Sequence, residues 1–258
     1  MNLLQPFTML TSAITLTLVV TASQVWASSI RVRSQLPQQA NQQEETDFSG
    51  DGRPGRREGG GSRSPCLAIN PPLTALMPVT NWGKTLKERP TFWFYIPYSP
   101  QTVRSGEFVL QNEQNNDVYR TPFTLPKTPG FVSLSIPATQ APLEINKWYR
   151  WYFKLYCQPQ KSSAPVFVEG WVQRSDLTTA LESRLKAATP EEKYTAYSNY
   201  SIWYDAVDSL AELHLTQPAS AVASNWAKQL RTVGLEQLKQ EPVVGSVVLS
   251  DTVGRQQR

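Results

Sequence analysis

Hydrophobic and polar residues alternate with a period of two in several short runs through the middle of the chain, and this pattern predicts β-strands. In "FVSLSIP", Val132 and Leu134 alternate with Ser133 and Ser135, as in a half-buried antiparallel strand. Pro or Gly separates nearly every run from the next. Short strands at this spacing predict an antiparallel β-sandwich over residues 66–175. The runs begin at Thr91, Glu107, Asp117, Phe131, Lys147 and Val166, with a weaker one at Leu73.

From residue 176 onward the hydrophobic period becomes helical. Leucines spaced by four lie on one stripe from Leu177, and Thr189, followed by Pro and two Glu, is a strong helix start. The helix that starts there is expected to reach His214, and a third helix ends at Gly234. The sequence therefore predicts a small C-terminal helical unit of about three helices over residues 176–242. Together with the sandwich this makes an α+β fold.

The segments that flank these two regions have a different composition. Residues 28–65 contain one aromatic, Phe48, among many Gln, Gly, Arg and Ser residues, and such a segment cannot bury enough apolar surface to fold. We expect a disordered linker. Its end, "GDGRPGRREGGGSR", is either a flexible tether with solvated charges or a contact for an acidic surface. Residues 243–258 form a tail whose apolar run from Val243 either docks as a further strand or frays.

The N-terminus predicts export. A mildly apolar run, "FTMLTSAITLTLVVTA", is followed by Val25-Trp26-Ala27, which fits the small-x-Ala rule of a signal-peptidase site. We expect residues 1–27 to be a signal peptide cleaved near Ala27, which leaves a periplasmic or cell-envelope protein with no transmembrane segment in its mature chain. The run lacks a preceding Lys or Arg, so an uncleaved anchor is the alternative.

Export gives meaning to the two cysteines, Cys66 and Cys157. An oxidising compartment allows them to pair, and the bridge would close a long loop and stabilise the fold by about 4 kcal/mol in the chain-entropy model. Two separately buried thiols are the alternative. Cys157 ends the strand that begins at Lys147, so the bridge would attach the incoming linker to the far end of that strand.

The strand "KWYRWYFKLYC" has two unlike faces. The first, expected in the core, carries Tyr149, Trp151, Phe153, Leu155 and Cys157. The second carries Trp148, Arg150, Tyr152, Lys154 and Tyr156. Aromatic rings interleaved with cations can stack on sugars, hold acidic groups by charge-assisted bonds, or form a protein interface. These five residues are the candidate ligand-binding face, and an envelope protein or an acidic polysaccharide is the expected partner.

The alternative for this face is intramolecular. Residues 66–175 carry 11 Lys and Arg against 6 Asp and Glu, a net charge of +5, whereas residues 176–258 carry 8 against 10, a net charge of −2. Opposite charges favour packing of the helices over the strand face. That packing would bring Trp203, Tyr204 and Trp226 against Trp148 and Tyr152.

A topological signal lies just before the same strand. Leu143 precedes Tyr149 by six residues across a turn, which resembles the tyrosine corner of fibronectin type III and other immunoglobulin-like sandwiches. In immunoglobulin domains a cysteine lies two residues after that tyrosine, whereas Cys157 lies eight after it. The expected fold is therefore an immunoglobulin- or fibronectin III-like sandwich whose disulfide does not cross the core.

Catalytic and cofactor-binding patterns are weak. A single histidine, His214, lies on a helical stripe where a capping or core role is expected, and with two bridged cysteines no metal site is assembled. Asp205, Asp208 and Glu212 recur at helical spacing and are interpreted as a solvated helix face. We expect no cofactor, and export argues against nucleic acid as a partner.

Two further functions remain open. One is a carboxylate-dependent glycan hydrolase, which requires two acidic residues within about 10 Å of each other in a cleft, one of them with a raised pKa. The other is a peptide-binding adaptor, because "IWYDAVDSLAELHLTQP" resembles the second helix of a tetratricopeptide repeat through Ala206 and Pro218. It requires an exposed groove lined by Tyr197, Tyr200 and Trp203.

An ordered set of motifs resembles one family. "GRPGRREGGGSR", "RPTFWFYIPY", "DVYRTPFTLP", "WYRWYFKLYC", "VFVEGWVQR" and "IWYDAVDSLAEL" together look like a family of cyanobacterial proteins catalogued as a domain of unknown function, family 928. The resemblance covers about residues 52–242 and implies no activity, ligand or catalytic residue. The expected function is that of an exported, non-enzymatic binding or scaffold module.

Overall fold

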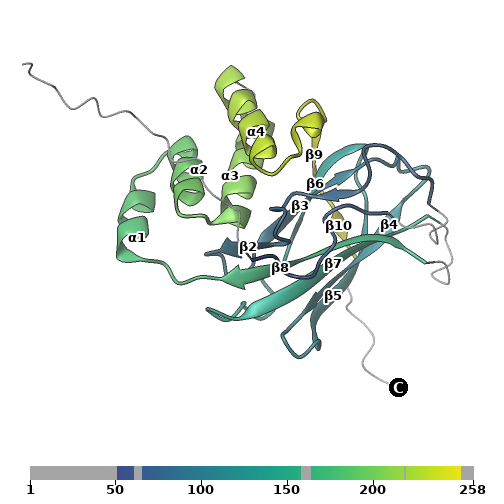
Figure 1. Ribbon diagram of the computed structural model, residues 1–258, viewed down its shortest axis with the longest axis horizontal. Helices are drawn as coiled ribbons and strands as arrows, with labels where there is room; N and C mark the ends of the chain where they lie inside the picture. The colour runs from purple at the N-terminus through teal and green to yellow at the C-terminus, as the bar shows by residue number, and fades with distance from the viewer. Residues whose placement is uncertain (1–50, 61–65, 158–163, 218, 251–258) are drawn as a thin grey trace, which may run out of the picture. The chain divides into compact units, whose positions relative to one another are not determined.

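The strands form two sheets in the computed structural model, which describes residues 51–60, 66–157, 164–217 and 219–250 (Figure 1). The first sheet has the order β1-β3-β6-β9 and the second β10-β5-β4-β7-β8-β2. The strands before the helices are β1 (Thr74–Ala75), β2 (Trp82–Thr85), β3 (Thr91–Ile96), β4 (Ser105–Gln111), β5 (Asp117–Thr124), β6 (Gly130–Ser135), β7 (Trp148–Tyr156) and β8 (Val166–Arg174). The predicted strand runs are confirmed, as is the mixed α+β class.

Aromatic side chains fill the space between the sheets. Phe94 of β3 stacks on Phe153 of β7 with ring centroids 3.9 Å apart, and Phe123 of β5 also stacks on Phe153, at 4.6 Å. Every residue of β3 is buried, as expected for a strand covered on both faces. Most strand pairs are antiparallel, but β2 runs parallel to β8 and β9 runs parallel to β6.

Four α-helices follow the strands within the described residues, so the prediction of about three helices is wrong. They are α1 (Thr179–Lys186), α2 (Pro190–Asn199), α3 (Trp203–Thr216) and α4 (Ser220–Thr232), followed by a 3-10 turn (Glu236–Leu238). The capping box at Thr189 is present, with Glu192 closing it. The helix it starts ends at Asn199 with Tyr200 as its C-cap, because Ser201 adopts a left-handed conformation with φ 56° that interrupts the helical backbone before α3.

Helix α3 joins the helical unit to the sheets, packing against β2, β3 and β9. In Figure 1, α1 and α2 lie farther from the strands than α3 does. The Trp203 indole N–H donates to the carbonyl oxygen of Leu76 at 2.9 Å. The Tyr204 hydroxyl accepts from the indole N–H of Trp151 at 2.8 Å and donates to the carbonyl oxygen of Trp171 at 2.9 Å.

The apolar run from Val243 docks as two strands and does not fray, which settles the alternative left open by the sequence. Strand β9 (Val243–Ser246) extends the first sheet beside β6, and β10 (Val248–Leu249) extends the second sheet beside β5. The C-terminal segment therefore contributes one edge strand to each sheet.

Residues 51–60, which we call the strap, were expected to belong to the disordered linker, and this expectation is wrong. Arg56 forms an antiparallel bridge with Glu169 of β8, and Glu58 forms one with Thr74 of β1. Strand β2 pairs with β8 only from Trp171 to Arg174, and the strap pairs with β8 at Glu169, where β2 no longer covers it. The strap also pairs with β1, the edge strand of the first sheet, so it covers part of an edge of each sheet. Composition does not reveal this order, because the strap is held by backbone hydrogen bonds and by arginine guanidinium groups on aromatic rings, and Pro54 is its only apolar side chain. The linker residues 28–50 and 61–65 lie outside the described residues.

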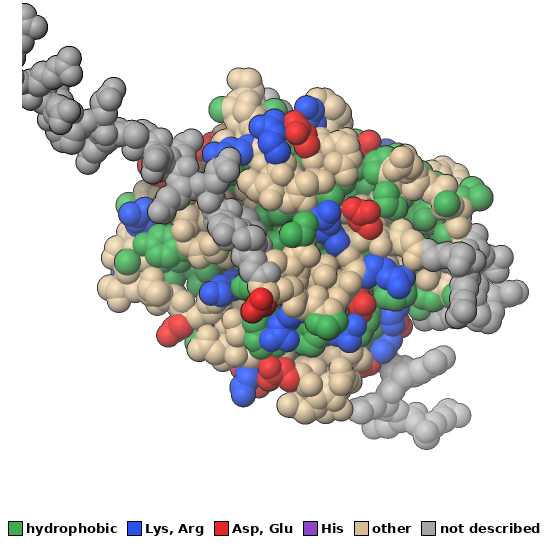
Figure 2. Space-filling view, in the orientation of Figure 1, with side chains coloured by type: hydrophobic (Ala, Val, Ile, Leu, Met, Phe, Trp, Pro, Cys, Tyr) green, Lys and Arg blue, Asp and Glu red, His purple; other side chains and the backbone are tan. Residues whose placement is uncertain are grey.

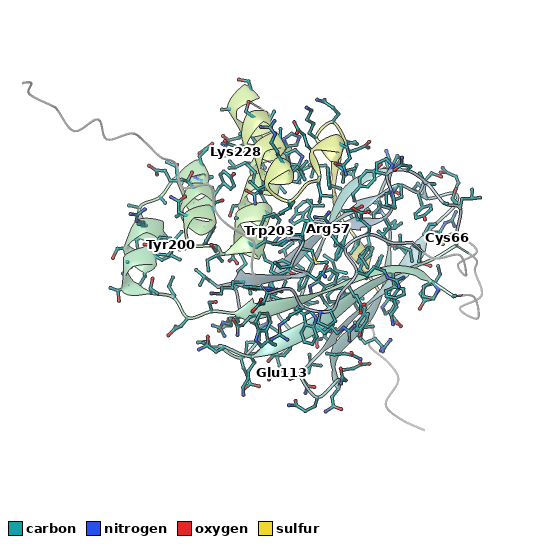
Figure 3. All side chains as sticks on the ribbon, viewed as in Figure 1. Arg57, Cys66, Glu113, Tyr200, Trp203 and Lys228 are labelled. Atoms are coloured by element: carbon teal, nitrogen blue, oxygen red, sulfur yellow. A yellow bond between two sulfur atoms is a disulfide. The ribbon has the colours of Figure 1, made fainter. Side chains whose placement is uncertain are left out.

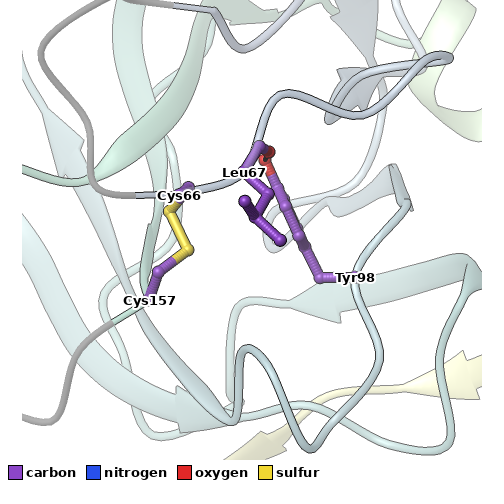
Figure 4. Close-up of a disulfide and its surroundings, with 4 residues drawn as sticks. All are labelled: Cys66, Leu67, Tyr98 and Cys157. Atoms are coloured by element: carbon purple, nitrogen blue, oxygen red, sulfur yellow. Dashed lines mark hydrogen bonds between the residues drawn. A yellow bond between two sulfur atoms is a disulfide. The ribbon is translucent and has the colours of Figure 1, made fainter.

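Cys66 and Cys157 form the predicted disulfide, with a Cα–Cα distance of 5.2 Å (Figure 4). The bridge lies at the end of β7, as expected, and both sulfur-bearing side chains pack on the edge of the core. Next to it, the Tyr98 hydroxyl donates to the carbonyl oxygen of Leu67 at 3.2 Å. The predicted signal peptide lies outside the described residues. Among the helices that are described, none has the length and apolar character needed to cross a bilayer.

Candidate functional site

The two faces of β7 differ in burial as the alternation predicts. Tyr149, Trp151, Phe153 and Leu155 are buried against the first sheet, whereas Trp148, Arg150, Tyr152, Lys154 and Tyr156 are all partly exposed. We call the exposed side of β7, with the neighbouring side chains of β4 and β8, the outer face. In Figure 2, blue cationic, red acidic and green hydrophobic side chains interleave over the region that Figure 1 labels β7 and β8.

The two cations of β7 on this face are ion-paired to the neighbouring strands. Arg150 Nη2 lies 2.6 Å from the Glu169 carboxylate of β8, and Lys154 Nζ lies 3.6 Å from the Glu107 carboxylate of β4. Glu107 also pairs with Arg120 of β5. Each acidic residue comes from a strand adjacent to its basic partner, so the sheet register brings these charges together. The charged side chains are therefore fixed in position, which lowers their conformational entropy before any ligand binds.

The strap supplies a second layer of cations. The Arg53 guanidinium carbon lies 3.7 Å from the ring centroid of Trp148 and 4.8 Å from that of Trp171, and the Arg56 guanidinium carbon lies 4.5 Å from the ring of Phe167. These are cation–π distances. The Trp171 indole N–H donates to the carbonyl oxygen of Pro54 at 2.8 Å, which fixes the strap backbone over β8.

The helices do not cover this face, so the intramolecular alternative is wrong in its detail. Trp203 and Tyr204 hydrogen-bond into the core from the other side of β7. Trp226 packs edge-on against Phe131 of the first sheet, with ring centroids 5.1 Å apart. The apolar side of α3 packs against β2, β3 and β9 at the side of the aromatic core. The strap, and not the helices, packs against Trp148 on the outer face.

Several residues of the outer face were not among those predicted from the sequence. Phe167, Glu169 and Trp171 of β8 could have been found, because "VFVEGWVQR" alternates and these residues share its polar side. Arg53 and Arg56 carried no such signal. Their placement depends on backbone pairing between the strap and β8, which composition does not reveal.

Burial changes the ionisation of this face only modestly. It raises the pKa of Tyr152, with nearby Arg150 acting in the opposite direction, and it raises the pKa of Tyr156, to which Glu107 adds. Both phenols therefore stay neutral hydrogen-bonding groups near pH 7. The outer face offers aromatic surface, hydroxyls and fixed charges, and these are elements of recognition.

A second polar cluster lies between α3 and the segment that follows β2. Asp205 and Asp208 were interpreted as a solvated helix face, but they are only 1% and 3% exposed, so that interpretation is wrong. Asp208 accepts from the Trp93 indole N–H at 2.9 Å and from the Lys87 ammonium at 2.6 Å. Asp205 accepts from the backbone N–H of Leu86 at 3.1 Å. The first half of α3 is buried on nearly all sides, so Asp205 and Asp208 are enclosed, whereas Glu212, the third residue of the predicted face, is exposed.

Enclosure dominates the electrostatics of this cluster. Burial raises the pKa of Asp205 to about 6. Burial also acts to lower the pKa of Lys87, but the carboxylates of Asp208, Asp205 and Glu212 together hold it above its usual value. One of the two conditions for a hydrolase, a carboxyl with a raised pKa, is thus met. Almost no surface of Asp205 or Asp208 is accessible to a substrate, however.

The remaining candidate residues, His214 and Trp203, pack against other side chains or are buried. His214 stacks on Trp226 with ring centroids 5.7 Å apart, in agreement with a core role. Trp203 is 1% exposed and cannot line a peptide groove with Tyr197 and Tyr200 (Figure 3). Within the described part of the chain, no group of three or more His, Cys, Asp or Glu side chains is placed to hold a metal ion.

Comparison with known proteins identifies the family. A family model described as "Domain of Unknown Function (DUF928)" matches residues 58–243, well over half of the chain. The chain belongs to the DUF928 family. The match begins inside the strap and ends at the first residue of β9, so it covers strands β1 to β8 and the four described α-helices and leaves out most of β9 and all of β10. No curated protein and no solved structure matches this DUF928 chain.

Proposed function

We propose that this DUF928 protein is an exported, non-enzymatic binding or scaffold module of the periplasm or cell envelope, and that the outer face is its working surface. The observation that carries the proposal is the half-exposed row of aromatic rings and fixed charges on β7 and β8. The Cys66–Cys157 disulfide supports export, because such bridges persist mainly in oxidising compartments. N-terminal sequencing of the protein recovered from cells is expected to begin near Ser28.

The composition of the outer face supports recognition. Trp, Tyr and Arg are the residues most often found at the energetic centres of interfaces, where rigid aromatic side chains lose little entropy on binding. Trp82 lies edge-on to Trp148 with ring centroids 5.4 Å apart, which extends the aromatic surface from β7 to β2. The ion pairs of Arg150 and Lys154 hold these cations in fixed positions. A face of this kind is pre-organised for a partner that presents polar and acidic groups.

The non-enzymatic part of the proposal rests on the enclosure of the carboxylates. Asp205 has the raised pKa of a general acid, but it is packed beneath Leu86 and hydrogen-bonded to the backbone there. Asp208 is held by Lys87 and Trp93. These contacts support a structural role, in which the pair attaches α3 to the segment between β2 and β3.

The immunoglobulin- or fibronectin III-like topology is also a proposal, and the strand order supports it. When β2 is left out and the remaining strands are lettered in chain order, β1, β3 and β6 become strands A, B and E of one sheet. Strands β4, β7 and β8 become C, F and G of the other sheet. The Tyr149 hydroxyl accepts from the backbone N–H of Glu144 at 3.1 Å, as at a tyrosine corner. Strands β2, β9 and β10 are then additions at the edges.

Binding to envelope material tests the proposal. The mature chain is expected to bind a component of an envelope fraction saturably, and Arg150→Ala and Lys154→Ala are expected to weaken binding about tenfold or more, since charge-assisted bonds contribute about 1.5–3 kcal/mol. Lys228→Ala is the matched control, because Lys228 is an exposed cation on α4 (Figure 3). Equal binding by all four proteins, or no saturable binding by the wild type, would remove the outer face from consideration.

A further inference from the structure

The two strap arginines on the outer face differ from its other cations in their partners. Arg150, Lys154 and Arg120 each pair with a carboxylate of the sheet. Neither Arg53 nor Arg56 lies within ion-pair distance of a described carboxylate, although Glu113 acts on Arg53 at longer range, and both guanidinium groups lie over aromatic rings. Arg56 Nη1 donates to the carbonyl oxygen of Gly60 at 3.0 Å, which leaves its other N–H groups available. A stacked guanidinium keeps its N–H edge free, and that edge matches the two oxygens of a carboxylate.

The strap backbone holds both arginines in place. The backbone N–H of Arg53 donates to the carbonyl oxygen of Thr80 at 2.8 Å, and the Asn81 side-chain amide donates to the carbonyl oxygen of Arg53 at 3.1 Å. Arg56 exchanges two backbone hydrogen bonds with Glu169, at 3.0 and 2.8 Å. Gly55 lies close against Asn81 between them. Both guanidinium groups are therefore positioned before a ligand arrives, which reduces the entropy lost on binding.

The rings beneath the arginines give their spacing. Trp171 and Phe167 lie on the same face of β8, four residues apart, which corresponds to about 13 Å along a strand. The ring of Tyr152 lies on β7 beside this row, 6.5 Å from that of Phe167. Two available guanidinium groups separated by aromatic surface fit an extended chain whose acidic groups recur along its length.

The same geometry disfavours a neutral sugar chain. Stacking on Trp148 would compete with the Arg53 guanidinium, which already lies 3.7 Å from the ring centroid. An acidic chain does not face this competition, because it binds the guanidinium itself. The net charge of +5 over residues 66–175 adds long-range attraction for a polyanion.

We propose that Arg53 and Arg56 of the strap bind carboxylate groups of an acidic polysaccharide laid along β8, with the rings of Trp148, Trp171 and Phe167 supporting the guanidinium groups. This inference rests on the proposed function and assigns a ligand class to the same face. It also makes the strap a ligand-binding element, although the sequence pattern predicted a linker there.

The test uses polygalacturonate and its fully methyl-esterified form, which has the same backbone without the charge. The mature wild-type chain is expected to bind polygalacturonate at least tenfold more tightly than the ester, and binding is expected to weaken as salt is added. The double variant Arg53→Gln/Arg56→Gln is expected to lose at least tenfold in affinity for polygalacturonate. Lys228→Ala, which removes one exposed cation of α4 and leaves Arg53 and Arg56 in place, is expected to bind as the wild type does.

Arg53→Lys separates recognition from folding. It keeps the charge but loses the planar fork, so we expect a several-fold loss of affinity with an unchanged near-ultraviolet circular dichroism spectrum. Unchanged binding by the double variant, or by Arg53→Lys with native dichroism, would overturn the inference. Equal or tighter binding of polyglutamate at matched charge would overturn it in favour of an acidic protein. Wild-type binding to envelope material but not to polygalacturonate would overturn it and leave the proposed function standing, whereas loss of both would remove the proposed function too.

Discussion

Asp205 is a carboxyl group enclosed by protein on nearly all sides, and its ionisation should affect the pH dependence of stability. Burial raises its pKa from 3.8 to about 6, so the folded state binds its proton more tightly than the unfolded state does. The stabilisation is therefore complete below about pH 4 and is lost as the pH rises through about 6. A shift of roughly two pKa units corresponds to about 3 kcal/mol.

Asp205→Asn tests this linkage. The variant lacks the titrating group, so the difference in unfolding free energy between wild type and variant is expected to change by about 2.4 kcal/mol between pH 4 and pH 7, in favour of the wild type at pH 4. Urea unfolding of both proteins across this range measures the difference. A difference that stays constant with pH would show that Asp205 titrates alike in the folded and unfolded states.

At the residue scale, the sequence predicted side-chain orientation well where an element has one buried face. The alternation of β7 placed Trp151 inside and Arg150 outside, and both placements are confirmed. It failed for Asp205 and Asp208, because a helix buried on most sides encloses polar residues that the same spacing would expose on a surface helix. Which side of α3 meets β2 and β3 depends on tertiary packing, and no local pattern contains that information.

The strap is held by backbone pairing at close range, and a single methyl group should loosen it. A Cβ atom at Gly55 would lie 2.7 Å from the Asn81 Cβ, so Gly55→Ala is expected to push the strap away from β8. The Glu169 N–H, which donates to the Arg56 carbonyl oxygen at 2.8 Å, would then lose its acceptor. We expect faster hydrogen–deuterium exchange at the Glu169 amide, by about tenfold or more.

Gly60→Ala is the matched control for this prediction. It adds the same methyl group within the same strap, but a Cβ atom at Gly60 meets nothing within 4 Å. The Glu169 amide is therefore expected to exchange at the wild-type rate. Similar exchange in wild type and Gly55→Ala would mean that the strap does not protect β8 in solution.

At the element scale, strands and helix starts were predictable and helix ends were less so. The capping box at Thr189 was found from the sequence and is present. The break before α3 was missed because Tyr197, Tyr200 and Tyr204 continue the three-and-four spacing across it. Ser201 enters the left-handed region without a Gly or Asn to signal it. The strap was missed for a related reason, since its order depends on partners distant in the chain.

At the scale of the whole molecule, the α+β class and the disulfide were predictable, and the way the layers join was not. Tyr204 of α3 connects Trp151 of β7 to the backbone of Trp171 in β8, so one phenol joins the helical unit to two strands. Parallel pairing of β2 with β8 and of β9 with β6 requires long crossovers. Such pairings follow from which edges remain open once the core has formed, and a single sequence does not encode that choice locally.

The disulfide should stabilise the whole fold by restricting its unfolded chain. Cys66 and Cys157 are separated by 91 positions, and the loop they close includes seven of the strands. Closing a loop of this length stabilises by about 4 kcal/mol in the chain-entropy model, and removal of a native bridge generally costs about 2–5 kcal/mol. The double variant Cys66→Ser/Cys157→Ser is expected to show this loss as a lower urea midpoint with a native-like spectrum.

Reductant should lower the midpoint of the wild type to that of the variant and leave the variant unchanged, because the variant has no bridge to reduce. A wild-type midpoint that does not respond to reductant at concentrations that open the bridge would contradict the assignment of this stability to the cross-link.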